Sequence, residues 1–318
     1  MKIRQNNYIV LSILLILAFL STTVYLAMNT HGNINFAFYI RVPKVLAFLV
    51  VAICISFATI SFQTMTENHL LTPSIIGIDS LYVLFQTVTV FFFSYRSILN
   101  SNQVINFIVS TLLVVLASNC LFYLFFKKYP GRILIMVLFG NILGILTNSL
   151  NQFLQVIMDP NEFTLTMSRT ITSFNQVNTD LIWLTVVIAF PCIIYLFLKS
   201  RELDVIHLGR EYAKSLGINV DKQYFKFFIV TIILTAASTS LVGPVSFLGF
   251  LGVNVAYRLF STYRHSILFI GSSLITFLFI IVGQTVAEHI FQTQVTLGVI
   301  IDFTGGLYFM FLLLKERK

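Results

Sequence analysis

Charged residues are scarce in this chain, and that scarcity limits what the chain can be. Asp, Glu, Lys and Arg together make up 10% of the sequence, whereas a soluble domain carries roughly 25%. Hydrophobic residues make up 57%, and the mean hydropathy is +0.90. Such a chain has too few polar groups to cover its own surface in water, so a soluble globular protein is excluded.

Cysteine, histidine and nucleotide-binding motifs are also sparse or missing. The three cysteines, Cys54, Cys120 and Cys192, lie in apolar runs, as small core residues do, and the five histidines have no partner at ligand spacing. A disulfide framework and a protein-bound metal centre are therefore not expected. The sequence contains no Gly-x-x-x-x-Gly-Lys-Ser/Thr phosphate loop, so we expect no nucleotide and no other cofactor on this chain.

The sequence does contain several long apolar runs. A helix of about 20 apolar residues crosses the hydrocarbon core of a bilayer, and the charge-free run at 227–257 allows two crossings if it is split at Gly243-Pro244. The runs are continuous rather than alternating, which excludes a transmembrane β-barrel. The predicted fold class is all-α, a polytopic membrane protein with about ten transmembrane helices in a single domain over 1–318. The spans are expected at 8–28, 44–63, 74–93, 104–126, 133–157, 181–198, 223–241, 245–260, 266–285 and 296–314.

The basic residues are distributed unevenly between the two sides of the membrane. We expect 8–28 to be the first helix rather than a signal peptide, because it is too long and has no small-residue cleavage site. With ten spans and a cytoplasmic N-terminus, all Lys and Arg except Arg41, Lys44, Arg96 and Arg169 fall on the cytoplasmic side. This asymmetry follows the positive-inside rule. It predicts a multi-pass cell-membrane protein with both termini in the cytoplasm and 158–180 outside, and it accounts for the net charge of +8 without nucleic acid.

Two proline-glycine patterns predict broken helices. Lipid cannot satisfy the carbonyl that Pro244 frees, so the Gly243-Pro244 break is expected where protein or a water-filled cavity takes over. Pro73, followed by Gly77, repeats the pattern of Pro244, followed by Gly249, which is a faint sign of an internal repeat.

The same run carries packing signals after the break. Gly249 and Gly252 allow a close approach of helices, and Arg258 lies one turn after Asn254, where its side chain can reach the cytoplasmic interface. The alternative is an ordinary kinked, tightly packed helix with a polar end.

Five segments, in order along the chain, resemble the permease subunits of iron-chelate and cobalamin ABC importers. They are RVPKVLAFLVVA at 41–52, FQTMTENHLLTPSIIGIDS at 62–80, LGREYAKSLGINV at 208–220, LVGPVSFLGFLGVNVAYRL at 241–259 and VTLGVIIDFTGGLYFMFLL at 295–313. The chain departs from the family pattern at Asn68-His69 (Asn-Pro), at Val253-Asn254 (Pro-His), at Arg210 (acidic) and at Thr296 (the proline region). DPNEF…SFNQVN and IIDFTGG are most similar to the branch that serves catecholate siderophores.

The resemblance implies the fold and the partners. We expect a type II ABC importer permease that is not itself an enzyme and that carries a ferric siderophore of catecholate type by alternating access. The implied partners are a second permease (a paralogue or a second copy), two ATPase subunits that bind the ATP, and an extracytoplasmic binding protein. A cobalamin or haem cargo is the alternative within the family. A stand-alone secondary transporter is the alternative outside it, and only Asp79 and Asp302 could couple such a transporter to ions.

The resemblance also implies site residues. The coupling segment, about 204–218, is expected to contact the ATPase as a short amphipathic helix with an apolar face of Val205, Leu208, Ala213, Leu216 and Ile218 and with Gly217 at its C-cap; a solvated loop is the alternative. Arg41 and Lys44 are expected to dock acidic residues of the binding protein, or else to anchor the helix at the interface. For Asp79 and Asp302 we favour helix-to-helix hydrogen bonds over contact with an anionic chelate. The assigned residues are Leu208, Gly209, Glu211, Ala213, Leu216 and Gly217 for coupling; Arg41 and Lys44 for docking; Pro73, Gly77, Gly243, Pro244, Gly249 and Arg258 for helix breaks and packing; and Asn141, Asn148, Asn151 and Asp302 as pathway candidates. For the three asparagines, hydrogen bonding between helices is the alternative.

Overall fold

The computed structural model describes residues 7–28, 34–93, 97–128, 132–175 and 177–316, and every regular element in these ranges is a helix. The all-α prediction is therefore confirmed. The elements are α1 (Asn7–Ala27), α2 (Ile34–Thr66), η1 (Pro73–Ile76), α3 (Ile78–Phe93), α4 (Ile98–Ser101), α5 (Gln103–Lys128), α6 (Ile133–Ile157), α7 (Pro160–Thr170), α8 (Thr179–Leu198), α9 (Ser200–Ile206), α10 (Arg210–Ser215), α11 (Val220–Val242), α12 (Ser246–Leu259), α13 (His265–His289) and α14 (Leu297–Glu316).

Each predicted span coincides with a helix. Within the described ranges, eight helices are long and apolar enough to cross a membrane, namely α1, α2, α5, α6, α8, α11, α13 and α14. The remaining two spans are the shorter helices α3 and α12, both of which follow a break. The start of α2 was predicted wrongly, because the helix continues through Pro43 and begins at Ile34. At about 1.5 Å per residue, a helix of 33 residues is longer than the hydrocarbon core of a bilayer is thick.

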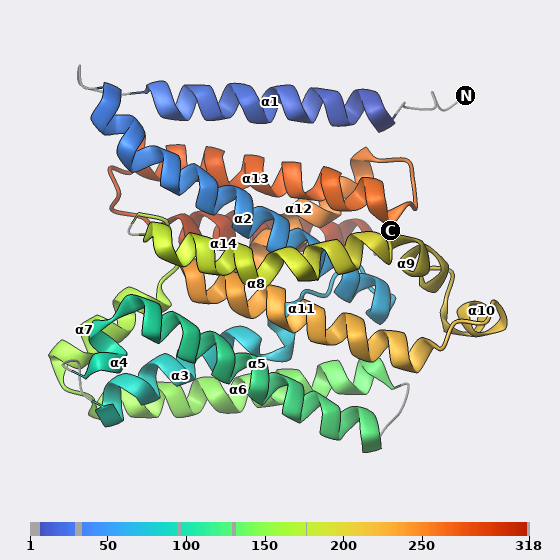
Figure 1. Ribbon diagram of the computed structural model, residues 1–318, viewed down its shortest axis with the longest axis horizontal. Coiled ribbons are helices and arrows are strands. Elements are labelled where there is room, and N and C mark those ends of the chain that lie inside the picture. The colour runs from blue at the N-terminus through green and yellow to red at the C-terminus, as the bar shows by residue number, and fades with distance from the viewer. Residues whose placement is uncertain (1–6, 29–33, 94–96, 129–131, 176, 317–318) are drawn as a thin grey trace.

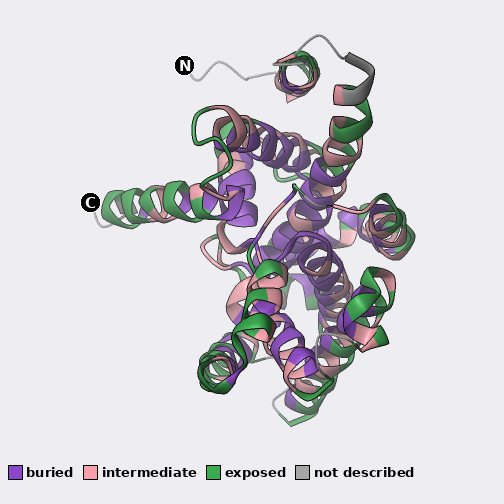
Figure 2. Cartoon of the chain, turned by 90° about the vertical axis from the view of Figure 1, so that its left-hand side faces the viewer, coloured by how far each residue is buried: buried purple, intermediate pink, exposed green. Residues whose placement is uncertain are grey.

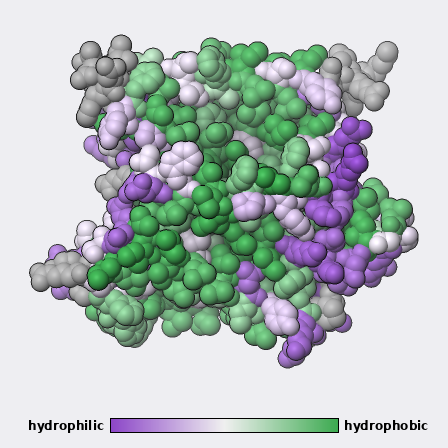
Figure 3. Space-filling view, viewed as in Figure 1, coloured by the Kyte–Doolittle hydropathy of each residue, from purple (hydrophilic) through white to green (hydrophobic). Residues whose placement is uncertain are grey.

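Most of the long helices run roughly side by side, and four short helices lie at the two ends of the bundle (Figure 1). Helices α4 and α7 lie at one end, and α9 and α10 lie at the other, where α1 begins and α14 ends. In the same view the surface is largely hydrophobic along its length, and hydrophilic residues gather at the end that carries α9 and α10 (Figure 3). This distribution is what a membrane-spanning bundle requires.

An internal repeat relates two halves of the bundle. Helix α2 packs on α13 as α11 packs on α5, and α3 packs on α6 as α12 packs on α14. Likewise α3 contacts α5 and α11, as α12 contacts α13 and α2. Because α2 and α11 run in opposite directions (Figure 1), the repeat is inverted, as in many transporters. The faint repeat seen in the sequence is thus real in the fold.

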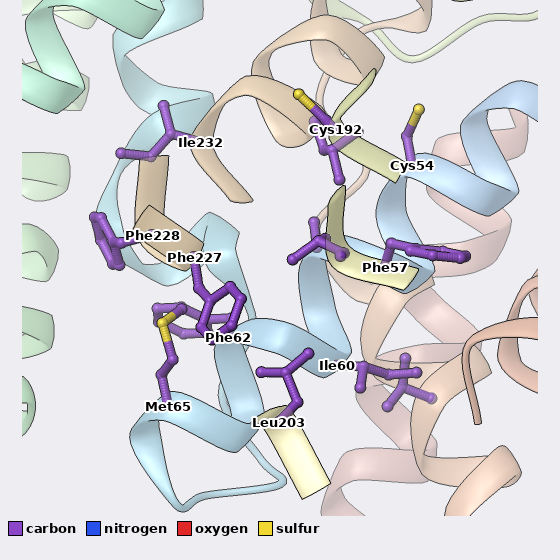
Figure 4. Packing of buried hydrophobic residues seen from close by; sticks show 14 of the residues in the cluster. Cys54, Phe57, Ile60, Phe62, Met65, Cys192, Leu203, Phe227, Phe228 and Ile232 are labelled. Carbon is purple, nitrogen blue, oxygen red and sulfur yellow. The ribbon is translucent and has the colours of Figure 1, made fainter. Parts of the chain in front are cut away.

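Helix α2 forms the centre of the packing. Its side chains face α8, α9 and α11 in one cluster (Figure 4), and on another side the ring of Phe57 stacks on Phe269 of α13, with 4.2 Å between the ring centroids. Cys54 and Cys192 are buried free thiols in this core, as predicted. Cys120 is also a free thiol but is exposed on α5, so its assignment to the core was wrong.

Candidate functional site

The two predicted helix breaks are built on glycines with left-handed backbone. Pro73 begins η1, which ends at Gly77 with a φ of +83°, and Gly243 ends α11 with a φ of +89°. This conformation favours glycine. A side chain at Gly77 would also be blocked, because its Cβ would lie 3.1 Å from the Cα of Gly144 on α6. Both breaks therefore depend on glycine.

The Asp79 carboxylate joins the two breaks. It is buried in the first turn of α3 and accepts a hydrogen bond from Oγ1 of Thr239 on α11 at 2.8 Å. Ser74 of η1 and Ser246 of α12 line the same polar cavity of about 20 Å³, which has room for about one water molecule. The helix-to-helix hydrogen bond expected for Asp79 is present, and the cavity provides the polar surroundings that a broken backbone needs inside a membrane.

Helix α12 fits tightly between α2 and α13. A Cβ atom on Gly249 would overlap Thr59 of α2, and one on Gly252 would overlap Thr276 of α13. Both glycines are thus required by close approach rather than by backbone conformation.

The C-terminal half of α12 has two different partners. Nδ2 of Asn254 donates to the backbone carbonyl of His69 at 3.0 Å, which fixes the segment before η1. Arg258, one turn later, is exposed, and its guanidinium lies 5.6 Å from the ring centroid of Tyr308 on α14. The polar pair therefore ties α12 to η1 on one side and to α14 on the other.

A groove of about 360 Å³ lies between η1, α12 and α14. Helix α14 stands away from the rest of the bundle (Figure 2), and Phe309 on α14 faces Phe250 on α12, with ring centroids 5.3 Å apart. Asp302 is exposed on α14, and its carboxylate faces the backbone N–H of Phe247 in the first turn of α12. A helix N-terminus favours a negative charge, so Asp302 stabilises the start of the broken helix at the edge of this groove.

The three candidate asparagines of α6 do not share an environment. Asn141 and Asn148 are exposed, seven residues apart on the same face. Asn151 is buried against α3, where its Oδ1 accepts a hydrogen bond from Thr87. Asn151 thus joins two helices, while Asn141 and Asn148 are available to a partner or to a water-filled path.

Arg41 and Lys44 both have partners within the chain. Arg41 donates to the backbone carbonyls of Tyr25, Leu26 and Met28 at the end of α1. Nζ of Lys44 lies 2.8 Å from a carboxylate oxygen of Glu288 on α13, and the side chains of the pair are only 15% and 13% exposed. These contacts were not predictable from the residue pattern. Docking by these two residues stays a prediction.

The predicted single amphipathic helix at 204–218 is two short helices. Gly209, with a φ of +104°, separates α9 from α10. Ala213 is fully buried inside the chain, whereas Leu208, Tyr212 and Leu216 are 60%, 70% and 64% exposed. Leu208 precedes the break, Tyr212 lies in α10 and Leu216 is its C-cap residue; we call these three exposed apolar residues the α10 face. The predicted common face was wrong, because the break at Gly209 turns α10 relative to α9.

The end of α10 is closed as the glycine predicted. The N–H of Gly217 donates to the carbonyl of Lys214 at 2.9 Å, and the N–H of Ile218 donates to that of Ala213 at 3.0 Å. This pair of bonds is the Schellman motif. Glu211 is exposed and pairs with Lys214 at 3.3 Å.

Polar contacts tie the α9–α10 segment to three long helices. Asp204 of α9 accepts from the backbone N–H of His265 on α13 and contacts its Nδ1, each at 2.7 Å. The Nε2 of His265 lies 2.8 Å from Oγ1 of Thr64 on α2. Arg210 of α10 pairs with Asp221 of α11 at 2.7 Å. Burial alone would raise the pKa of Asp204, but the hydrogen bonds from His265 outweigh it and lower that pKa.

The close approach of three histidines near α9 was not predicted from the sequence. The His207 ring lies 5.9 Å from those of His69 and His265, although the three are far apart in sequence. No group of His, Cys, Asp or Glu among the described residues has the arrangement of a metal site. Burial lowers the pKa of His207.

The comparisons with known proteins agree with this arrangement. Residues 8–315 match the sequence model of the FecCD transport family. The petrobactin import system permease protein YclO of Bacillus subtilis (strain 168) is 44% identical over 90% of this chain and 91% of its own. The petrobactin import system permease protein FatC of Bacillus anthracis is 31% identical over 99% of this chain and 91% of its own. A solved inward-facing structure of a metal-chelate type ABC transporter has a TM-score of 0.85 at 20% identity, covering 98% of this chain and 100% of that one. The resemblance found in the sequence is confirmed.

Proposed function

The chain belongs to the FecCD transport family, and from that premise we propose that it is the membrane-spanning permease subunit of an ABC importer that carries a ferric siderophore into the cytoplasm. The observation that supports this most is similarity along nearly the whole chain to two petrobactin import permeases, at 44% and 31% identity. Petrobactin is a catecholate-type siderophore, and a cargo of this type is proposed here.

The energy for transport has to come from partner subunits. The sequence holds no phosphate loop of its own, and a glycine-rich loop of this kind is what cradles ATP phosphates. We therefore assign ATP hydrolysis to two ATPase subunits and delivery of the chelate to an extracytoplasmic binding protein. A second permease subunit, a paralogue or a second copy, completes the membrane part.

The surface formed by α6, η1, α12 and α14 is the proposed pathway side. It carries the groove beside α14, Asp302 at its edge and the exposed amides of Asn141 and Asn148. Polar groups that face lipid are costly, so a partner permease or water is expected to cover this side. Asp79 and Asp302 both face groups of the helix breaks, which supports a structural role and disfavours ion coupling by a secondary transporter.

The cytoplasmic contact is assigned to the α10 face, Leu208, Tyr212 and Leu216. An exposed apolar face on a short polar segment is typical of a protein interface. The contacts of Asp204 and Arg210 to α11 and α13 give this segment a rigid connection to the bundle. Helix α1 begins and α14 ends at this end of the bundle (Figure 1), and both termini are proposed to be cytoplasmic.

The test is uptake by cells that lack the chain. A deletion strain supplied with ferric petrobactin, a ferric hydroxamate, haem and cobalamin, each radiolabelled, should lose uptake of ferric petrobactin and regain it with the cloned chain. Loss of haem or cobalamin uptake alone would identify one of those as the cargo instead. Unchanged uptake of all four would contradict an importer of this family.

A further inference from the structure

A second cavity lies away from the α14 groove, at the end of the bundle that carries α4 and α7. Its volume is about 600 Å³, and residues of α3, α4, α5, α7, α8 and α11 line it. Small-molecule sites have volumes of about 300–1,000 Å³. Of the residues that line it, only Gly243 belongs to a helix break described above.

Arg169 of α7 is the charged group of this cavity. One guanidinium nitrogen, Nη1, donates to Oδ1 of Asn100 at 3.0 Å and to Oε1 of Gln86 at 3.4 Å. The other, Nη2, donates to the backbone carbonyl of Asn100. All of these acceptors are neutral. The side chain is partly buried, and an arginine stays charged at any physiological pH.

The charge of Arg169 is not balanced within the described part of the chain. No carboxylate in those residues lies within 4 Å of its nitrogens, whereas Lys44, another partly buried basic residue at this end, has Glu288. A buried charge is costly unless it is paired. A neutral donor would be enough to tie α4 to α7, and a guanidinium adds the ability to pair with an anion.

The remaining walls of the cavity suit an anion. Side-chain amides and hydroxyls line the same cavity as Arg169, among them Gln103, Asn106, Ser168, Ser173 and Ser240. Such groups donate hydrogen bonds, and a guanidinium with a free edge binds a carboxylate or a phosphate through two parallel bonds. Gln86 also holds Asn106, by a 2.9 Å bond to its Oδ1, so the polar wall is fixed before a ligand arrives.

We propose that this cavity is a binding site for a ligand that carries an oxyanion, a carboxylate or a phosphate, with Arg169 as the counter-charge. The ligand is either a soluble anion that enters from outside or the headgroup of a membrane phospholipid. The site is separate from the proposed cargo pathway, so this proposal does not depend on which cargo the chain carries.

The experiment measures thermal unfolding of the full-length chain, purified with its partner subunits in dodecyl maltoside and freed of phospholipid. One arm adds citrate or inorganic phosphate at constant ionic strength, with chloride as the reference anion. The other arm adds phosphatidylglycerol. A ligand that binds only the folded state raises the unfolding midpoint in a saturable way, by about 3 °C at an excess of several tens of times its Kd. A saturable rise in either arm supports the site and identifies its source.

Three variants decide whether the rise comes from this cavity. Arg169→Gln should remove it, while Arg201→Gln, an exposed arginine of α9, should leave it unchanged. Asn100→Asp keeps Arg169 and places a carboxylate at its 3.0 Å contact, so it should also remove the rise, and it remains informative if Arg169→Gln does not fold. The proposal is overturned if neither arm stabilises the wild-type complex beyond chloride, or if the rise persists in Arg169→Gln or in Asn100→Asp.

Discussion

The ammonium of Lys44 on α2 and the carboxylate of Glu288 on α13 lie 2.8 Å apart. Tyr25 and Gln284 also donate to the same carboxylate, at 3.1 Å and 2.8 Å. This network joins α1, α2 and α13 at the end of the bundle opposite α9 and α10. A residue assigned to docking from sequence therefore has a structural role as well, and the two roles can be separated by experiment.

Reversing the pair separates the two roles. Lys44→Glu alone should destabilise the protein by about 3 kcal/mol, because two carboxylates then face each other in a largely buried place. Lys44→Glu combined with Glu288→Lys should regain most of that stability in a thermal unfolding measurement. If Lys44 also docks the binding protein, the double variant stays weak in uptake at low substrate. Full uptake in the double variant would remove Lys44 from docking.

Gly252 is predicted to tolerate no side chain. Gly252→Ala places a methyl group against Thr276 and pushes α12 away from α13, which should cost about 1–3 kcal/mol through overpacking. Gly306→Ala on α14 is the matched control, because its added methyl group meets nothing within 4 Å. Thermal unfolding of both variants tests the packing. Equal midpoints would mean that α12 is less tightly held than described.

The α10 face is predicted to carry the contact with the ATPase. Tyr212→Asp should leave the permease inserted but reduce substrate-stimulated ATP hydrolysis by about tenfold or more, because a central aromatic contact is replaced by a charge. Lys222→Ala, exposed at the start of α11, should have little effect. Normal ATP hydrolysis and uptake in Tyr212→Asp would exclude this face from coupling.

Ala213→Arg is predicted to impair the permease for a different reason than Tyr212→Asp does. Ala213 is fully buried within the chain, so a charged side chain would unfold the α9–α10 segment rather than block an interface. Limited proteolysis of the purified protein should show new cleavage near Gly209 in Ala213→Arg and none in Tyr212→Asp. Identical cleavage patterns would contradict the two separate roles.

The Asp204–His265 contact predicts a pH dependence at the same end. Because the folded-state pKa of Asp204 is lowered, its contribution to stability is present above the ordinary carboxyl pKa of about 4 and is lost as the pH falls below that value. Asp204→Asn should therefore destabilise the segment at pH 7 and lose this acid sensitivity. Hydrogen exchange of α9 at pH 7 and pH 3 measures both effects. An equal response to acid in wild type and variant would assign the sensitivity to another group.

Topology is testable with single cysteines. In a background with Cys54, Cys120 and Cys192 replaced, a cysteine at exposed Asn161 on α7 should react with an impermeant thiol reagent in intact cells. A cysteine at exposed Ser215 on α10 should react only after lysis. The reverse pattern would invert the proposed orientation.

The sequence predicted the helices well because each apolar run of membrane length has to form its own backbone hydrogen bonds in lipid. Gly77 and Gly243 were recognisable for the same reason, since a proline or glycine inside such a run has few other uses. Contacts between distant residues were not predictable. Nothing near Lys44 in sequence points to Glu288, and the inward turn of Ala213 depends on the backbone at Gly209, which residue spacing does not reveal.

The central claim is ATP-driven movement of a ferric siderophore through this chain. The most direct measurement reconstitutes the permease with its partner permease and ATPase in liposomes, with the binding protein loaded with radiolabelled ferric petrobactin inside and ATP outside, where the α9–α10 end is exposed. The account predicts that label leaves the liposomes only when ATP can be hydrolysed, and only slowly with the Tyr212→Asp chain. Release at the same rate without ATP, or no release from a fully assembled complex, would contradict it.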